Sequence, residues 1–176
     1  NGRRQGIVFS GNLGYEPNVS AISWFLKNVW HLILAECPEA CLSIVGRGLS
    51  SRNATIYCTY KGVNVIGEVE DMYSELEKYR VAIAPMISGS GMQFKILEAM
   101  AVGTPVVTTK TGLGDLCARN LEQILIEDNA QEFAHSVVSL YQNLERANKI
   151  AKSAFDYVKR EQQDSTVVST FFASIK

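Results

Sequence analysis

The chain has 176 residues, of which 47% are hydrophobic and 20% charged, which fits one domain with a sizeable core and excludes a disordered chain. Its 17 basic and 18 acidic side chains give a formal net charge of -1, so no charge surplus indicates binding to nucleic acid or to an anionic membrane. The longest apolar run, around Ile22 to Leu34, is interrupted by Lys27, Asn28 and His31, so it is too polar to span a bilayer. We expect a single domain over residues 1–176. Because the chain begins with Asn1 and shows no signal sequence, we interpret it as a fragment of a longer cytoplasmic protein.

The cysteines and histidines predict neither a metal site nor a disulfide framework. The four cysteines are Cys37, Cys41, Cys58 and Cys117. Their spacing matches neither the paired C-x-x-C of zinc sites nor a dense disulfide pattern, so reduced, half-buried thiols explain them. His31 and His135 each fall in a helical pattern without a second type of ligand nearby. We therefore expect no bound metal.

Short apolar runs that end in glycine turns alternate with helical patterns in the first half of the chain. The run at residues 7–10 followed by Gly11 predicts a strand that leads into a turn. Asn18 is the expected N-cap of an amphipathic helix that ends at Pro38. Two further strands, each followed by a glycine turn, are expected at residues 42–45 and 63–66.

The second half continues the alternation. We expect strands at residues 81–84, 105–108 and 124–126, and helices at 71–79, 93–102, 130–144, 147–160 and 164–175. Asp164 or Ser165 is the expected cap of the last helix. Because parallel strands need crossover connections that cover both faces of a sheet, the alternation predicts an α/β fold: a doubly wound parallel sheet of about six strands. The glycine turns then gather at the carboxyl edge of the sheet, where such folds bind ligands.

The densest group of candidate site residues surrounds the start of the helix near residue 93. Small residues at 88–91 allow an anion to approach the N–H groups of the helix N-terminus, which suits a phosphate. Lys95 lies one turn into the helix and can neutralise that phosphate. Glu98 projects from nearly the same face and can accept hydrogen bonds from a ribose diol. The alternative is an ordinary i,i+3 ion pair between Lys95 and Glu98, which the convergence of loop, lysine and carboxylate makes less favoured.

Other residues at this edge give weaker signals. The backbone N–H groups of Gly11 and Gly14 are expected to face the same crevice, although a tight turn alone explains these glycines. Arg47 can contact a diphosphate or the carbonyls of a base, or it can be solvated. Aromatic residues at helical spacing are expected to pack in the core and not to stack on a base. These aromatic residues are Trp24, Phe25, Trp30 and Phe94.

The stretch GSGMQFKILEAMAVGTPVV at residues 89–107 resembles the donor-site signature of retaining GT-B glycosyltransferases of the family 4 group. That signature reads as a glycine-rich loop, Lys, Leu-Glu-Ala-Met-Ala, Gly and Pro-Val-Val. The loops at residues 11–18, 44–48 and 65–71 also resemble, in order, those of a bacterial subgroup that makes polysaccharides.

This resemblance implies that the chain is the C-terminal, sugar-nucleotide-binding half of a two-domain enzyme and that the acceptor half is missing. By position, Lys95 and Glu98 are the implied catalytic residues. The implied donor-binding residues are Gly11, Asn12, Leu13, Gly14, Arg47, Gly67, Glu68, Val69, Asp71, Ser90, Gly91, Met92, Gln93, Lys95 and Glu98. The implied partners are a nucleotide-diphosphate sugar and a glycan or lipid-linked acceptor held mainly by the missing half. Any peripheral membrane contact is expected only through that half.

One position departs from the group. Many members carry two glutamates with seven residues between them, and the first falls at Ser90 here, which cannot stabilise positive charge on a sugar. No Asp-x-Asp motif is present where a manganese site needs it, so we expect transfer without metal or cofactor. Two alternatives stay open, a non-catalytic nucleotide-binding or interaction domain and half of a sugar-nucleotide epimerase. The absence of G-x-G-x-x-G after the first strand argues against a dinucleotide-dependent oxidoreductase.

Overall fold

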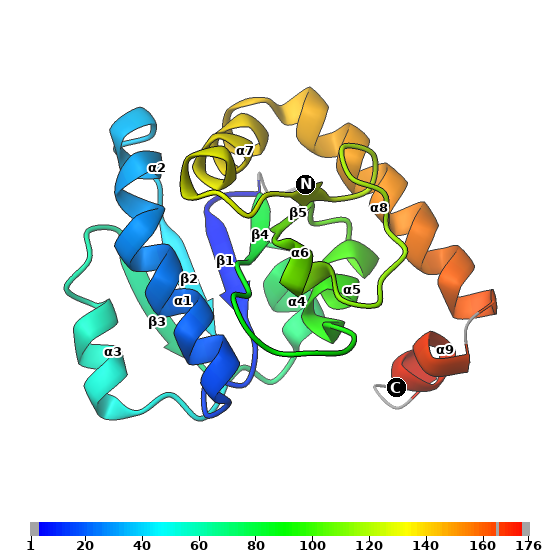
Figure 1. Ribbon diagram of the computed structural model, residues 1–176, viewed down its shortest axis with the longest axis horizontal. Helices are drawn as coiled ribbons and strands as arrows, with labels where there is room; N and C mark the ends of the chain where they lie inside the picture. Colours follow the sequence, from blue (N-terminus) through cyan, green and yellow to red (C-terminus); the bar gives the residue numbers. More distant parts are fainter. Residues whose placement is uncertain (1–3, 165, 174–176) are drawn as a thin grey trace.

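A parallel β-sheet forms the centre of the molecule, with helices on both faces (Figure 1). The computed structural model describes residues 4–164 and 166–173. Within these residues the six strands are β1 Ile7–Ser10, β2 Leu42–Val45, β3 Val63–Gly67, β4 Val81–Ala84, β5 Val106–Thr108 and β6 Leu125–Ile126. Their order is β3-β2-β1-β4-β5-β6 and all neighbours pair in parallel. The predicted doubly wound sheet is confirmed. The strand order reverses between β1 and β4, where such folds leave a crevice for a ligand.

Two apolar cores lie on opposite faces of the sheet. The helices are α1 Glu16–Asn28, α2 Trp30–Glu36, α3 Ser51–Tyr57, α4 Met72–Leu76, α5 Phe94–Ala101, α6 Lys110–Leu113, α7 Ala130–Gln142, α8 Leu144–Asp164 and α9 Thr166–Ala173. Along β1, Ile7 and Phe9 pack with α1, α2 and α7, whereas Val8 packs with α4, α5 and α8. Successive strand residues point to opposite faces, so a strand covered on both sides is apolar throughout.

The first helix differs from its prediction. It begins at Glu16 after an N-cap at Tyr15, and Pro17 occupies the first turn, where the fixed φ of proline is compatible with a helix. Asn18 is therefore not the N-cap: it lies inside α1 and is buried. The helix expected to reach Pro38 is interrupted at Val29, and α2 continues from there.

Two short helices, α3 and α6, are missing from the sequence prediction. Each is too short and too polar to show an apolar period, and a side-chain cap marks its start. Ser50 accepts a hydrogen bond from the N–H of Asn53, and Thr109 accepts one from the N–H of Gly112. Local capping therefore decides these helices.

Three smaller predictions are corrected or fall outside the description. Asp164 is the last residue of α8, and its side chain lies outside the described part of the structure. Ser165 and Ile175 lie outside the described residues. All four cysteines are free, but only Cys37 is buried; the expectation of half-buried thiols is wrong for the other three, which are exposed.

None of the helices within residues 4–164 and 166–173 has both the length and the apolar character that a membrane span requires.

Arg4 fastens the carboxyl end of α5. Its guanidinium donates to the carbonyls of Val102 and Gly103 at 2.6 and 2.8 Å and to the Thr104 hydroxyl at 2.6 Å. These bonds satisfy carbonyls that the helix leaves without partners. The cation also lies at the end of the helix dipole that favours positive charge. The Arg4 hydrogen bonds therefore hold the carboxyl end of α5, and the other end of this helix lies at the site described below.

Loss of the Arg4 hydrogen bonds is expected to destabilise the fold. In Arg4→Met the bonds are lost while most of the side-chain volume stays, and we expect a loss of about 2 kcal/mol, or roughly 4–8 °C in the thermal midpoint. Arg52→Met is the matched control because Arg52 is exposed on α3. If calorimetry gave both variants the same thermal midpoint, the Arg4 hydrogen bonds would not stabilise the fold.

Candidate functional site

A cavity of about 560 Å³ opens at the carboxyl edge of the sheet, at the point where the strand order reverses. The loops that follow β1, β2, β3 and β4 contribute to it, together with the first turns of α1 and α5. Figure 1 shows α1 and α5 on either side of β1, so residues far apart in sequence meet here. The lining residues are Gly11, Asn12, Tyr15, Asn18, Gly46, Arg47, Glu68, Val69, Met72, Ser90, Met92, Gln93, Phe94, Lys95 and Glu98.

Most of the predicted site residues line this cavity. The ten that do are Gly11, Asn12, Arg47, Glu68, Val69, Ser90, Met92, Gln93, Lys95 and Glu98. The five that do not are Leu13, Gly14, Gly67, Asp71 and Gly91. Leu13 is buried in the core. Asp71 caps α4 by accepting from the N–H groups of Tyr73 and Ser74 at 2.9 and 3.3 Å, and its bonds with Ser74 hold its pKa below the usual value.

Lys95 carries its charge into the cavity without a carboxylate partner. Its ammonium group donates to Asn18 Oδ1 and to Met86 Sδ, and lies 5.3 Å from the ring centroid of Phe9. Burial lowers the pKa of Lys95 to about 8, an effect that the charge of Glu98 opposes. No ion pair within 4.0 Å joins Lys95 to Glu98 in the described chain. The alternative of an ordinary helical ion pair is therefore wrong, and a protonated Lys95 remains available to an anion.

Glu98 is a half-buried carboxylate with unused acceptor capacity. Burial raises its pKa above the usual value, while the charge of Lys95 partly offsets this rise. In the described residues no hydrogen bond to its carboxylate is found, so two hydroxyls of a ligand can donate to it. The nearby Tyr73 hydroxyl is buried and also has no partner there. Burial, with the charges of Glu98 and Asp71, raises the pKa of Tyr73 to about 12.

Asn18 joins the first glycine loop to Lys95. It is only 4% exposed; its Nδ2 donates to the carbonyl of Asn12 at 2.8 Å and its Oδ1 accepts from Lys95. Sequence reasoning missed this role by treating Asn18 as a cap. The available signal is its spacing with Ile22 and Phe25, which places a polar residue on the buried face of α1. Such a residue needs a polar partner inside the fold.

The first two glycine loops are packed backbone against backbone. Gly46 has a φ of +141°, and a Cβ built on it would lie 1.8 Å from the carbonyl oxygen of Gly11. Two hydrogen bonds tie the loops together, from Gly11 N to Val45 O at 3.0 Å and from Leu13 N to Arg47 O at 2.7 Å. Glycine at position 46 is therefore required by loop packing, and this contact fixes where Gly11 and Asn12 meet the cavity.

The start of α5 offers backbone donors to a ligand. Its N-cap residue, Gln93, makes no side-chain cap hydrogen bond, and Ile96 N–H donates to the Gln93 carbonyl at 2.9 Å. In the described chain the N–H groups of Phe94 and Lys95, two residues that line the cavity, have no hydrogen-bond partner and are the donors left for a ligand. Phe94 also lines the cavity and stacks on Phe171 at 4.1 Å between ring centroids, so it is a wall residue and not fully part of the core. Phe25 and Trp30 are buried as predicted.

The described residues include no group of three or more His, Cys, Asp or Glu that could hold a metal ion.

Comparisons with known proteins find a matching family and a shared fold. A family described as Glycosyl transferases group 1 matches residues 4–143, which include every residue that lines the cavity. A relative in Klebsiella pneumoniae, "Uncharacterized 44.6 kDa protein in cps region", is 27% identical over 173 residues. The match covers 94% of this chain and 45% of that protein.

Solved structures share the fold. A mutant of Staphylococcus aureus TarM, in complex with fondaparinux, alpha-GlcNAc-glycerol and UDP, has a TM-score of 0.76 and 17% identity over 97% of this chain and 36% of its own. The C-terminal domain of the group 1 glycosyl transferase LpcC from Francisella tularensis has a TM-score of 0.69 and 16% identity over 90% of this chain and 87% of that chain. The chain thus spans less than half of the Klebsiella and TarM proteins and most of the LpcC domain.

Proposed function

The chain belongs to the glycosyl transferases group 1, and from this membership we propose that it is the sugar-nucleotide-binding half of a retaining glycosyltransferase. One observation supports the proposal most. At the carboxyl edge of the sheet, the first turn of α5 presents backbone donors, the cation of Lys95 and the free carboxylate of Glu98 to a single cavity. A nucleoside diphosphate needs these groups, because its phosphates are anionic and its ribose carries a diol.

The proposed pose places each part of the donor against a named group. The diphosphate lies at the N-terminus of α5 beside Lys95, the ribose diol donates to Glu98, and the base lies near Glu68 and Val69. Asn12 and Arg47 lie where they can contact the diphosphate from the opposite wall. The presence of UDP in the TarM structure supports a nucleotide in this kind of cavity.

In the proposed reaction the bond between the anomeric carbon and the phosphate oxygen breaks, and its electron pair stays on the nucleoside diphosphate. A bond forms from the acceptor oxygen to that carbon, with retained configuration, and the acceptor proton leaves. The cation of Lys95 and the N–H groups of α5 stabilise the negative charge that develops on the leaving phosphate. Ser90, which lines the cavity, replaces a carboxylate with a neutral hydroxyl, so the charge stabilisation rests on the leaving-group side.

The acceptor in this proposal is a glycan or a lipid-linked molecule, bound mainly by a part of the protein beyond these 176 residues. We assign the reaction to the cytoplasm and to the synthesis of cell-surface polysaccharide. The coverage of less than half of the Klebsiella relative supports a larger protein.

A nucleotide panel tests the donor site. The chain is heated with UDP, GDP, ADP, CDP or dTDP, with inorganic diphosphate as the comparison ligand. At a concentration 100 times its dissociation constant, the preferred nucleotide is expected to add about 2.7 kcal/mol of stability, or roughly 5–11 °C. One nucleotide that outperforms diphosphate identifies the base. If none stabilises a folded sample more than diphosphate does, the base and ribose contacts of the proposal are wrong.

Affinity for the preferred nucleotide is expected to depend on pH through Lys95. Burial lowers the pKa of Lys95 to about 8, so the free site is charged below pH 8 and loses its charge above it. Between pH 7.5 and 9.5 the nucleotide phosphates stay ionised, and affinity is expected to fall as pH rises, by up to about tenfold per pH unit above 8. Calorimetric titrations of the chain and of Lys95→Arg, whose guanidinium stays charged, measure this. An equal pH dependence in both proteins would contradict it.

The non-catalytic alternative has one supporting feature, the serine at position 90. Sugar transfer or donor hydrolysis by the longer protein separates the two functions. A protein that binds the nucleotide and releases no sugar over many hours would favour a binding domain.

A further inference from the structure

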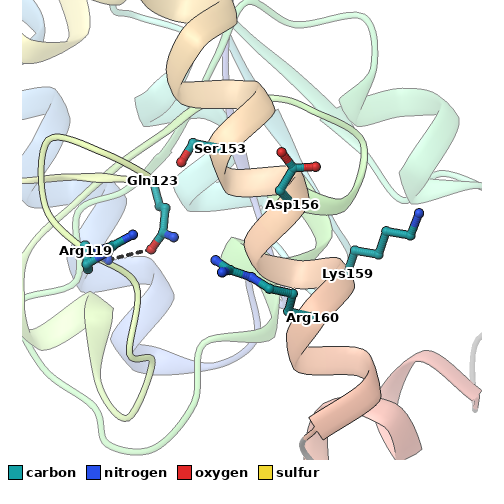
Figure 2. A pocket seen from close by; sticks show the side chains of 6 residues that line it. All are labelled: Arg119, Gln123, Ser153, Asp156, Lys159 and Arg160. Carbon is teal, nitrogen blue, oxygen red and sulfur yellow. Dashed lines mark hydrogen bonds between the residues drawn. The ribbon is translucent and has the colours of Figure 1, made fainter.

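A second cavity, of about 400 Å³, lies between the segment that precedes β6 and helix α8 (Figure 2). Its lining residues are Arg119, Gln123, Ser153, Asp156, Lys159 and Arg160. None of them lines the cavity at the carboxyl edge of the sheet. Three cationic side chains against one anionic side chain make this lining positive, although the chain as a whole is close to neutral.

Hydrogen bonds hold the segment at residues 119–123, which forms one wall of the second cavity. The N–H of Arg119 donates to Gln123 Oε1 at 2.8 Å, and the N–H of Gln123 donates to the carbonyl of Arg119 at 3.0 Å. Asn120 Oδ1 accepts from the N–H groups of Leu121 and Ile126 at 2.9 and 3.0 Å. Gln123 is only 2% exposed, so this network fixes its side chain. With Oε1 occupied, Nε2 is the free donor of this side chain: it makes no hydrogen bond within the described residues, and the cavity surface reaches it.

Arg160 meets this wall from α8. Figure 2 shows its guanidinium and the Ser153 hydroxyl directed toward Gln123, whereas Asp156 and Lys159 point elsewhere. In the described chain Arg160 makes neither a hydrogen bond nor an ion pair. Within residues 4–164 and 166–173, the one ion pair found for Arg119 is with Glu122, at 2.9 Å, and both side chains are more than half exposed. An exposed pair of this kind is weak, so it does not neutralise the cavity.

Donors of the two walls therefore face each other across the cavity, and Asp156, the one carboxylate in its lining, points elsewhere. We propose that this cavity is an anion site that binds a phosphate group between Arg160 and Arg119, with Gln123 Nε2 and the Ser153 hydroxyl as further donors. Guanidinium groups match phosphate oxygens in pairs, and a tetrahedral phosphate presents oxygens to both walls at once. The ligand is a phosphate ester, either a soluble one or a phospholipid headgroup. This site does not depend on the proposed sugar-nucleotide function.

Nuclear magnetic resonance with methyl phosphate tests the site. The titration uses Lys95→Met, so that phosphate binding at the other cavity does not contribute. A saturable shift of the Gln123 side-chain amide is expected. Arg160→Gln is expected to weaken binding at least about tenfold, and Asp156→Asn to strengthen it several-fold because a repelling carboxylate is removed. Lys152→Gln is the matched control: it removes one exposed cation from α8 outside the lining, and affinity is expected to stay within about twofold.

The absence of a saturable shift at Gln123 would overturn the proposal. So would an equal loss of affinity in Lys152→Gln and Arg160→Gln, because it would indicate a diffuse charge effect. Sedimentation with phosphatidylcholine vesicles, with and without phosphatidylglycerol, then identifies the source of the phosphate. Binding to the anionic vesicles that Arg160→Gln abolishes assigns the phospholipid headgroup, whereas a methyl phosphate site without vesicle binding assigns a soluble ester.

Discussion

Lys95→Met is expected to reduce the affinity for the preferred nucleoside diphosphate about 100-fold and to leave the chain folded. Lys95 lines the cavity and is the only cationic residue of α5, all of which the structure describes. The substitution removes this charge. Loss of a charge-assisted contact of this kind costs about 2–4 kcal/mol, and the cost is larger where the contact stabilises a leaving phosphate. Turnover by the longer protein is therefore expected to fall 100- to 1,000-fold.

Stability is expected to change little in the same variant. Burying the ammonium group carries a desolvation cost, as the lowered pKa of Lys95 indicates, and methionine removes this cost. The substitution also leaves Asn18 Oδ1 without its donor, which acts in the opposite direction. We expect the thermal midpoint to stay within a few degrees.

Calorimetric titration and thermal unfolding of Lys95→Met, with Lys27→Met as control, measure both effects. Lys27 is exposed in the last turn of α1 and contributes nothing to the cavity. Nucleotide affinity within threefold of the unmodified chain would remove Lys95 from the proposed site. Equal weakening in the control would attribute the effect to overall charge.

Gly46→Ala is expected to be the most destabilising substitution in the glycine loops. An alanine Cβ would lie 1.8 Å from the Gly11 carbonyl oxygen, and the backbone there has a φ of +141°. Overpacking and backbone strain together are expected to cost about 4 kcal/mol, or roughly 8–16 °C in the thermal midpoint. Because the clash displaces Gly11 and Asn12, nucleotide affinity is expected to fall as well.

Gly67→Ala separates strain from packing. Gly67 also has a positive φ, +82°, but a Cβ built on it meets nothing within 4 Å. It is expected to cost about 1–2 kcal/mol through backbone strain alone. Thermal unfolding of Gly46→Ala and Gly67→Ala gives the free energy of unfolding of each variant. The difference between the two losses measures the contribution of the contact between the first two loops. Equal midpoints would mean that the first two loops do not depend on each other.

The sequence predicted the succession of strands along the chain better than it predicted the exact ends of helices, and ten of its fifteen candidate site residues line one cavity. A strand covered on both faces must be apolar throughout, so the segments at 7–10, 42–45 and 81–84 are recognisable without any partner. Lys95 and Glu98 are recognisable because three residues of helix place them on nearly one face. In contrast, α3 and α6 depend on single capping residues, which leave no period to detect.

What the sequence by itself determined is the alternation of strand and helix, and with it the gathering of the glycine turns at one edge of the sheet. Only the tertiary structure decided that Asn18 faces inward to Lys95 and that Gly46 presses on Gly11. It also decided that Gln123 and Arg160 face each other across the second cavity. The physical reason is that periodicity and propensity act over a few residues, whereas these contacts join segments 35 to 77 residues apart and depend on how the elements pack.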